Sequence, residues 1–474
     1  MKQSRGRIAC LALGFVLAIT NPGGAQGASR TPHQALAREI FAELIGINTT
    51  HEHGNTTPAA MAVARRLLAA GYPAQDVRVV GPGERNQNLL ARLRGTGRRR
   101  PILLLAHLDV VEARVEDWSL DPFTLTEQDG RFYGRGTSDI KDMAAIFAAT
   151  LIRLKRERFL PDRDVVLALT AGEESGADYN GVQWLLANHR DWIDAAYCIN
   201  GDGGDPLERG GRPIARKVQA SEKVYADFQL EVTQPGGHSS MPTPANAIYQ
   251  LAAALQRLAS FEFPVRLSHI TRAYLDRAAA TMPPAVAADM RLAARLLPDS
   301  GAVARLSVQS AYFNAQLRTT CVATRLEAGH ANNALPQRAL AVVNCRLLPD
   351  DHPDSVGAAL RRVVADPAVA VSLLDSVVPS PPSPLAPDVL EPLERITAEL
   401  WPGVPVIPSM ETGATDGLFL RNAGIPVYGV SGVFLDADDV RAHGRDERIG
   451  VRQFYAGAEF TYRFVKALAA SARR

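Results

Sequence analysis

PILLLAHLD, residues 101–109, is the most informative segment of this 474-residue chain. Five apolar residues follow Pro101 without a polar break, and His107 and Asp109 stand at the end of the segment. An unbroken apolar run of this kind predicts a strand buried on both faces, as in a parallel sheet covered by helices. We therefore expect His107 and Asp109 where the strand emerges, at the carboxyl edge of the sheet, where open α/β sheets bind ligands.

Two further apolar runs end in the same way. Residues 164–170 (DVVLALT) lead to Glu173 and Glu174, and residues 194–200 (DAAYCIN) lead to Asp202. The carboxyl ends of parallel strands meet at one edge of a sheet, so these acids are expected beside the imidazole of His107. Carboxylate and imidazole donors without a thiolate suit zinc, manganese or cobalt. The sequence therefore predicts a metal site at this edge.

Two more donors stand outside these strands. Asp139 lies in a glycine-containing turn ahead of a predicted helix, residues 143–155, and His443 lies in RAHGRDER near the end of the chain. A pair of ions about 3.5–4 Å apart needs a bridging carboxylate and two further ligands for each ion. The six donors supply five ligands and leave one acid as a base, a division that suits the adjacent Glu173 and Glu174. Each acid alone could be a solvated surface group or a helix cap, but that explanation does not suit the whole set.

Composition and length describe a globular protein of more than one domain. The chain is 46% hydrophobic and 22% charged, and its formal net charge is +2. It therefore lacks the basic excess that a nucleic-acid partner requires. The length predicts two or three domains.

Residues 1–28 predict a cleavable secretory signal and hence a periplasmic or secreted protein. A basic start is followed by an apolar run, residues 8–19, and then by small residues, which is the usual order of such a signal. The apolar run is shorter than the roughly 20 residues that span a bilayer. An uncleaved anchor is the alternative, and no membrane association is expected from the rest of the chain.

The patterning changes twice along the chain. Residues 29–218 and 381–474 alternate apolar strands with helices, which indicates one catalytic domain in two parts. Between them, residues 219–380 form an inserted α+β domain with an Ala/Arg/Leu-rich helical elaboration at residues 271–297. The strands expected there alternate apolar and polar residues, as half-exposed antiparallel strands do; they are residues 224–232, 319–326 and 339–347.

Three cysteines follow the predicted signal, namely Cys198, Cys321 and Cys345. Their odd number and wide spacing argue against a disulfide framework. We expect all three to be small buried hydrophobic residues, although Cys321 and Cys345 could pair if their strands are neighbours.

Seven motifs occur in an order that resembles the M20 metallopeptidase family, and the resemblance covers nearly the whole chain after the signal. It implies a phosphorylase/hydrolase-like mixed α/β sheet with helices on both faces, interrupted by a ferredoxin-like lid or dimerisation domain, and so allows a homodimer. The motifs are AHLDVV (106–111), GRGTSDIKDMAA (134–145), TAGEESG (170–176), NGDGG (200–204), GGHSS (236–240), TGATDG (412–417) and RAHGRDE (441–447).

The resemblance implies a centre of two divalent metal ions, with zinc expected and cobalt or manganese as alternatives. One ion is held by His107, Asp139 and Asp202, and Asp139 bridges to a second ion held by Glu174 and His443. A cis peptide bond is expected after Asp139.

Further roles follow from the same resemblance. Glu173 is expected to be the general base, and Asp109 to orient the ring of His107. His238 in the GGHSS motif is expected to stabilise the oxyanion, often across a dimer interface; taken alone it would be a turn histidine.

Substrate binding is expected to involve the inserted domain. Arg346 is similar to the arginine that grips a substrate carboxylate in the family, although an arginine at a strand end is commonly a surface residue. Asn314 is a weaker candidate for the same pocket. Gly413 and Thr415 lie in a loop whose backbone N–H groups could bind a carboxylate, or which could be a plain tight turn.

These roles predict hydrolysis of an amide, in which an activated hydroxide attacks the carbonyl and Glu173 moves the proton to the leaving nitrogen. We expect a di-zinc exopeptidase acting on short peptides or dipeptides with a free carboxylate, and an N-acyl amino acid deacylase is the alternative. Aspartate rather than glutamate at position 202 is similar to the dipeptidase, aminopeptidase and aminoacylase members. A serine hydrolase is disfavoured because residues 429–432 lack the last glycine of a Gly-x-Ser-x-Gly elbow. An inactive binding protein is disfavoured because all six donor positions are filled.

Overall fold

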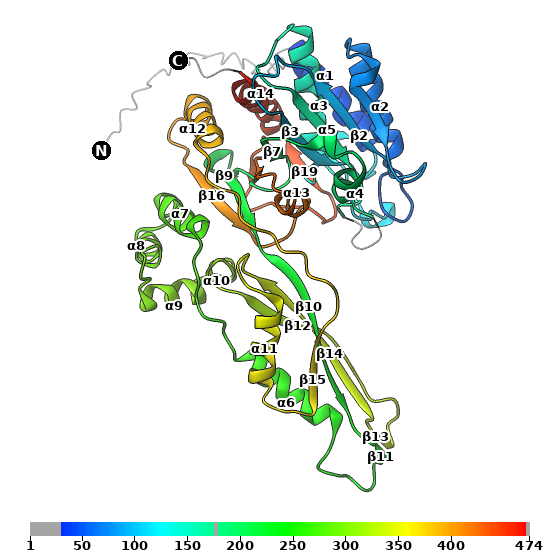
Figure 1. The fold of residues 1–474 in the computed structure, drawn as a ribbon, viewed down its shortest axis with the longest axis vertical. Helices are drawn as coiled ribbons and strands as arrows, with labels where there is room; N and C mark the ends of the chain where they lie inside the picture. The colour runs from blue at the N-terminus through cyan, green and yellow to red at the C-terminus, as the bar shows by residue number, and fades with distance from the viewer. Residues whose placement is uncertain (1–29, 175–178, 471–474) are drawn as a thin grey trace, which may run out of the picture.

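The computed structural model describes residues 30–174 and 179–470. The predicted secretory signal therefore lies outside the described residues. The ribbon forms an upper lobe built around a large sheet and an elongated lower lobe built around a smaller one (Figure 1). Among the described helices, none combines the length and apolar character needed to cross a membrane.

The large sheet is mixed, and its centre is the strand expected from the apolar segment. β3 (Ile102–His107) lies between β6 (Val165–Thr170) and β7 (Tyr197–Asn200), parallel to both. Every residue of these three strands is buried, as the unbroken apolar runs predict. The other strands of the sheet are β1 (Val77–Val80), β2 (Asn88–Leu93), β8 (Leu207–Arg209), β9 (Arg212–Glu222), β16 (Val406–Glu411), β17 (Val427–Gly429) and β18 (Leu435–Asp436).

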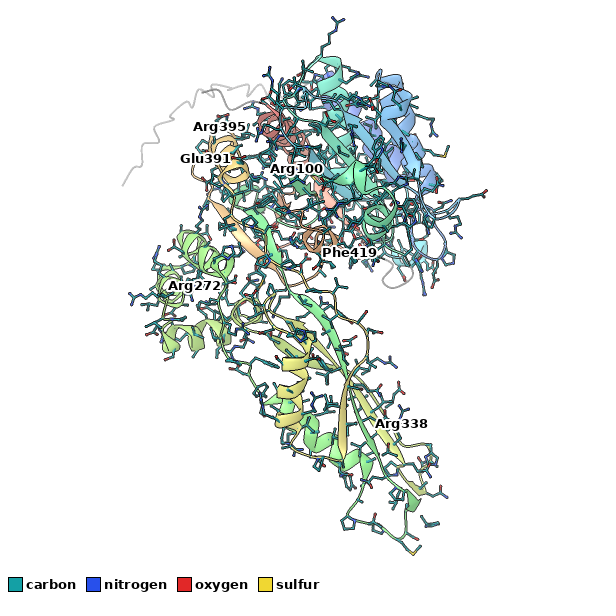
Figure 2. The ribbon with its side chains drawn as sticks, viewed as in Figure 1. Arg100, Arg272, Arg338, Glu391, Arg395 and Phe419 are labelled. Atoms are coloured by element: carbon teal, nitrogen blue, oxygen red, sulfur yellow. A yellow bond between two sulfur atoms is a disulfide. The ribbon has the colours of Figure 1, made fainter. Side chains whose placement is uncertain are left out.

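Alternate residues of β3 enter two separate hydrophobic cores, because successive side chains of a strand point to opposite faces. Leu104 packs with one set of helices and Leu105 with another, so both faces of the sheet are covered. The first set is α1 (Pro32–Ile45), α2 (Thr57–Ala69), α3 (Lys141–Arg156), α12 (Pro387–Leu400) and α14 (Val451–Ala469). The second is α4 (Gly181–Asn188), α5 (Arg190–Ile193) and α13 (Gly417–Asn422), whose Phe419 lies low in the upper lobe (Figure 2).

The lower lobe contains a four-stranded antiparallel sheet in the order β12-β14-β10-β15. Along the chain, the first strand of this sheet is β10, and only Lys223 separates it from β9 of the large sheet. Its strands are β10 (Val224–Thr233), β12 (Thr320–Ala328), β14 (Arg338–Leu347) and β15 (Val369–Leu373), and its helices are α6 (Ala247–Ala259) and α11 (Pro353–Val364). The alternation in β10 is the predicted one, with Phe228 buried under the helices and Tyr225 exposed. Arg338 at the start of β14 is exposed and lies in the lower part of this lobe (Figure 2).

The helical elaboration is larger than the sequence predicts, and it packs against the large sheet rather than against the sheet of the lower lobe. Residues 271–297 do not form one helical stretch, because Pro283 and Pro284 interrupt it. Four helices are present, and they share a core with Ala215 of β9 and Ile407 of β16 at the edge of the large sheet. They are α7 (His269–Ala278), α8 (Pro284–Ala293), α9 (Ser300–Gln309) and α10 (Ala311–Leu317).

One cysteine expectation is wrong and one is confirmed. Cys321 and Cys345 form a disulfide rather than staying unpaired. They stand directly opposite each other on β12 and β14, with Cα atoms 4.1 Å apart, and such a cross-strand position brings two thiols into bonding range. Cys198 is free and buried, as expected.

Candidate metal centre

His107 is the last residue of β3, and its ring is fixed by the backbone that follows. Nδ1 donates to the carbonyl oxygen of Asp109 at 2.9 Å, which leaves Nε2 as the atom that can bind a metal. Nε2 lies 3.2 Å from Asp139 Oδ1. The carboxylate of Asp109 lies farther from the ring, at 3.9 Å, and accepts instead from the backbone amide of Glu174 at 2.8 Å.

A small three-stranded sheet brings Asp139 and His443 together. β5 (Arg131–Tyr133) pairs with β4 (Thr126–Gln128) and with β19 (Arg448–Gly450). The chain leaves β5 toward Asp139, and it enters β19 from His443. Because β5 and β19 run antiparallel, these two segments emerge at the same end of the pair. The pairing continues beyond the strands, where the Gly134 amide donates to the carbonyl of Glu447 at 3.1 Å.

The six predicted donors converge on one edge of the large sheet. His443 Nε2 lies 3.0 Å from Asp139 Oδ2 and 2.9 Å from Glu174 Oε1. Two groups have ligand atoms within 4.8 Å of one another: one is His107, Glu173 and Glu174, and the other is Asp139, Glu174 and His443. The peptide bond between Asp139 and Ile140 is cis. The donor set consists of oxygen and imidazole nitrogen, and one carboxylate lies between two histidines, so these residues fit a pair of divalent ions.

The electrostatics of this edge also favour a cation. Burial raises the pKa of Asp202 well above its usual value, and the negative charge of Asp139 adds to the shift. Burial likewise raises the pKa of Glu173, with a contribution from Asp202. Asp202 follows β7 and lies outside both compact donor groups. Several carboxylates that share one site in this way cannot all ionise without a positive charge among them.

The two histidines carry that positive charge in part. Hydrogen bonds to Asp139 and Glu174 raise the pKa of His443 to about 10. Burial opposes a charge on His107, but the hydrogen bond to Asp139 and the nearby charge of Glu173 outweigh it, so the pKa of His107 is raised as well. Metal binding requires neutral imidazole, so an incoming ion displaces these protons.

The five residues predicted to bind the oxyanion or the substrate lie outside the two donor groups. His238 is on β11 (Gly237–His238), which pairs with β13 (Ala334–Leu335) at the far tip of the lower lobe. It is exposed, and its Nδ1 lies 2.7 Å from the hydroxyl of Ser240. A single chain therefore does not bring His238 to the metal centre.

Arg346 and Asn314 lie on the inserted sheet and on α10. The guanidinium of Arg346 lies 4.6 Å from the ring centroid of Tyr225, and burial lowers the pKa of this arginine. The side-chain oxygen of Asn314 is buried without a hydrogen-bond partner. Gly413 is exposed, whereas the amide and hydroxyl of Thr415 both donate to Glu222, at 3.1 and 2.9 Å.

Sequence reasoning gave no role to Asp416 and Glu447. Asp416 is buried and accepts from the Thr170 hydroxyl at 3.2 Å and from the Asn180 amide at 2.5 Å, and burial raises its pKa to about 6. Glu447 is fully buried and contacts the turn that carries Asp139. Both acids stand inside the quoted motifs. Their burial could not be read from the sequence, because neither follows an apolar run.

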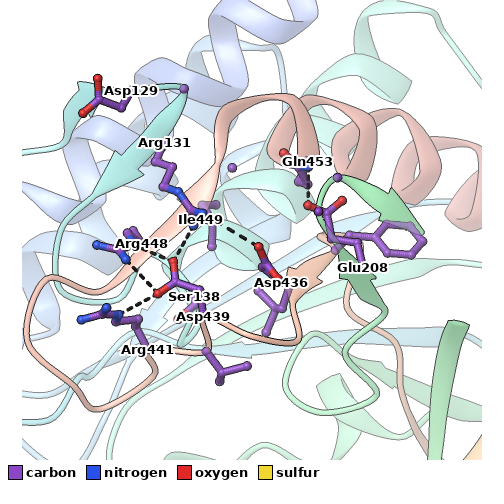
Figure 3. A pocket seen from close by; sticks show the side chains of 17 residues that line it. Asp129, Arg131, Ser138, Glu208, Asp436, Asp439, Arg441, Arg448, Ile449 and Gln453 are labelled. Atoms are coloured by element: carbon purple, nitrogen blue, oxygen red, sulfur yellow. Dashed lines mark hydrogen bonds and ion pairs between the residues drawn. The ribbon is translucent and has the colours of Figure 1, made fainter. Parts of the chain in front are cut away.

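A polar cavity of about 270 Å³ lies next to the centre, but it contains none of the predicted donors (Figure 3). Its wall includes Ser138, the neighbour of Asp139, and a carboxylate held by three arginines. Asp439 accepts from Arg131 at 2.7 Å, from Arg448 at 2.8 Å and from Arg441 at 2.9 Å. These bonds anchor the segment in which His443 lies, so the cavity belongs to the support of the metal centre.

Residues 103–467 match Peptidase family M20/M25/M40, and the chain belongs to this family. It is 30% identical over 377 residues to the human N-fatty-acyl-amino acid synthase/hydrolase PM20D1, across 77% of this chain and 74% of that protein. The protein is therefore a metal-dependent hydrolase of peptide or other amide bonds, as the motifs predict.

Solved structures show the same fold. An M20 family metallo-carboxypeptidase from Sulfolobus solfataricus superposes with a TM-score of 0.68 and 18% identity, over 91% of this chain and 99% of that one. A dinuclear metal-binding peptidase of the M20 family from Bacillus subtilis gives a TM-score of 0.58 and 12% identity, over 92% and 98%. The predicted mixed α/β fold class is confirmed.

Proposed function

We propose that this hydrolase releases a free amino acid from an N-acyl amino acid, with two divalent ions held by the six-donor edge. The observation that carries the proposal is the carboxylate of Asp139 between His107 and His443, with Glu173 and Glu174 beside it. The similarity to the human N-fatty-acyl-amino acid synthase/hydrolase supports the substrate class. Zinc is the expected metal, and cobalt or manganese would suit the same donors.

Five residues would hold the ions: His107, Asp139 and Asp202 the first, and Asp139, Glu174 and His443 the second. When bound, the ions supply Lewis acidity and lower the pKa of a water molecule. Glu173, which lies at the same edge, takes the proton of the attacking water and returns it to the leaving nitrogen. The backbone carbonyl of Asp109, rather than its carboxylate, would keep the ring of His107 in the tautomer that ligates through Nε2.

The free carboxylate of the leaving amino acid would be bound from the inserted domain. Arg346 is the proposed partner, because a guanidinium matches a carboxylate with two parallel hydrogen bonds. Asn314 has an unpartnered side-chain oxygen that could accept from the substrate amide. The loop at Gly413 and Thr415 is the proposed source of backbone donors. Thr415 already gives its own amide to Glu222, so Gly413 is the more available of the two.

A second candidate is an exopeptidase for short peptides, and the family that the chain matches is a peptidase family. The two substrate classes share the same leaving group, an amino acid with a free carboxylate, and differ only on the acyl side. A direct assay separates them: the purified zinc-loaded chain is given N-acyl amino acids of increasing acyl length, dipeptides, and the methyl ester of each.

We expect hydrolysis of the N-acyl amino acids, loss of activity with a chelator, and poor turnover of the esters. Turnover of dipeptides alone would establish the second candidate instead. Activity that a chelator leaves unchanged would contradict the metal mechanism for both.

We also propose a homodimer through the inserted sheet. β12 is an edge strand, so its outer backbone groups are open to pairing with a second copy. Its Val322 and Leu326 are 61% and 64% exposed. His238 at the exposed tip would then reach the centre of the other copy. Mixing His238→Ala with Glu173→Ala tests this, because an active mixture of two inactive variants requires His238 to act across the dimer. An inactive mixture with proven subunit exchange would contradict it.

A periplasmic or secreted location is proposed from two features. One is the signal-like segment at residues 1–28, and the other is the disulfide between Cys321 and Cys345. Disulfides persist mainly in oxidising compartments. Fractionation of cells that express the full chain tests the location.

A further inference from the structure

Glu447 is fully buried, and its carboxylate gathers the turn that carries Asp139. Oε1 accepts from the Ser138 amide at 2.7 Å, the Ser138 hydroxyl at 3.0 Å and the Asp139 amide at 3.1 Å. Oε2 accepts from the Gly136 amide at 3.1 Å. One carboxylate therefore binds three backbone amides of the turn, and the last of them belongs to Asp139, the residue between the two histidines.

Arg135 connects the same carboxylate to the segment that carries the second histidine. Its Nη1 donates to Glu447 Oε2 at 2.6 Å, and its Nη2 donates to the carbonyls of Gly444 at 3.1 Å and His443 at 3.5 Å. Its guanidinium lies 5.0 Å from the ring centroid of Trp118. Both members of the pair are almost fully inaccessible, with side-chain exposures of 3% and 0%.

The backbone at His443 needs such support. His443 has a φ of 62°, and the left-handed region is unfavourable for a residue with a side chain. Gly136, with a φ of 87°, reaches the same region without that cost. A buried ion pair is costly to break on one side only, because the remaining charge is left without a partner. The pair therefore holds Asp139 and His443 in one arrangement, although neither Arg135 nor Glu447 is placed to bind a metal itself.

We propose that the buried pair of Arg135 and Glu447 determines the affinity of the ion held by Asp139, Glu174 and His443. Both are positioning residues, and the inference rests on the proposed two-ion centre. Loss of a residue that orients metal ligands typically costs roughly 10- to 100-fold in metal affinity. We expect the larger loss at this ion, because Arg135 also holds the segment of its ligand His443, whereas the other ion shares only Asp139 with it.

The experiment measures metal affinity without measuring activity. Full-length wild type and Glu447→Gln are stripped of metal, titrated with Co²⁺ against a competing chelator, and followed by the visible absorption of cobalt. Glu222→Gln is the matched control: Glu222 is equally buried and pairs with Arg421 at 3.0 Å, but it contacts none of the proposed ligands. Both variants are expected to lower the melting temperature, whereas only Glu447→Gln should weaken one cobalt site by about tenfold or more.

Arg135→Lys keeps the charge and loses the link to the His443 segment, so it covers the case in which Glu447→Gln does not fold. It should weaken the same cobalt site more than the other. Two normal sites in Glu447→Gln or in Arg135→Lys would overturn the inference, as would an equal loss in Glu222→Gln. A wild type that binds no cobalt would instead overturn the proposed function, so the two failures are distinguishable.

Discussion

The carboxylate of Asp139 lies between two imidazoles, with Oδ1 3.2 Å from His107 and Oδ2 3.0 Å from His443. The two histidines come from the two parts of the catalytic domain. His107 ends β3 in the first part, and His443 precedes β19 in the second. The centre therefore forms only when both parts of the catalytic domain are folded together, on either side of the inserted sheet.

Glu173→Gln should keep both metal ions and lose most of the turnover. The amide is nearly the size of the carboxylate but cannot take a proton, so kcat should fall by about 10²- to 10⁴-fold. Metal content and kcat are measured on the same preparation. Glu174→Gln is the neighbouring comparison and should lose metal instead. Full activity in Glu173→Gln would remove this residue as the base.

Arg346→Ala should weaken binding of substrates that have a free carboxylate. A hydrogen bond to a charged group contributes about 1.5–3 kcal/mol, so kcat/KM should fall roughly 10- to 100-fold, mainly through KM. Arg362→Ala is the control, because Arg362 is exposed on α11 of the same domain. An unchanged preference for the free acid over its methyl ester would reject Arg346 as the carboxylate partner.

Reduction of the Cys321–Cys345 bond should destabilise the inserted sheet. The bond closes a loop with a sequence separation of 24, for which the loss of chain entropy corresponds to about 3 kcal/mol. The melting temperature should fall with reductant in the wild type. It should not respond in the double variant Cys321→Ser/Cys345→Ser, and it should still respond in Cys198→Ala. A response in the double variant would show that reductant acts elsewhere.

Lys223 should make stability depend on pH above neutrality. Burial lowers the pKa of Lys223 to about 7, whereas in the unfolded chain its pKa is about 10.4. The unfolded chain therefore binds more protons between these pH values, so the free energy of unfolding rises with pH, by at most about 1.4 kcal/mol per pH unit. The melting temperature of the wild type, relative to Lys223→Met, should rise from pH 7 to pH 10. A constant difference would contradict the shift.

The central sheet was predictable because its signal is local. The unbroken apolar runs of β3, β6 and β7 require burial on both faces, and the polar residues that follow must then meet at one edge. That argument locates His107, Glu173, Glu174 and Asp202 without any tertiary information.

The remaining features depend on strand register, which a single sequence does not reveal. The meeting of Asp139 with His443 depends on the pairing of β5 with β19, two strands of only three residues. The disulfide depends on Cys321 standing opposite Cys345. The burial of Glu447 depends on the same short pairing, so its contacts do not follow from the RAHGRDE motif alone.

The packing of α7 to α10 against β9 and β16 multiplies the connections between the lobes. An ordinary insertion is joined to its host by two chain segments, but here the polypeptide passes four times between the four-stranded sheet and the body formed by the large sheet and these helices. The passages are residue 223, residues 260–268, residues 318–319 and residues 374–386. Two of these passages are only one or two residues long. A rotation of the lower lobe must therefore twist all four passages at once, and this requirement confines the rotation to a narrow range of directions.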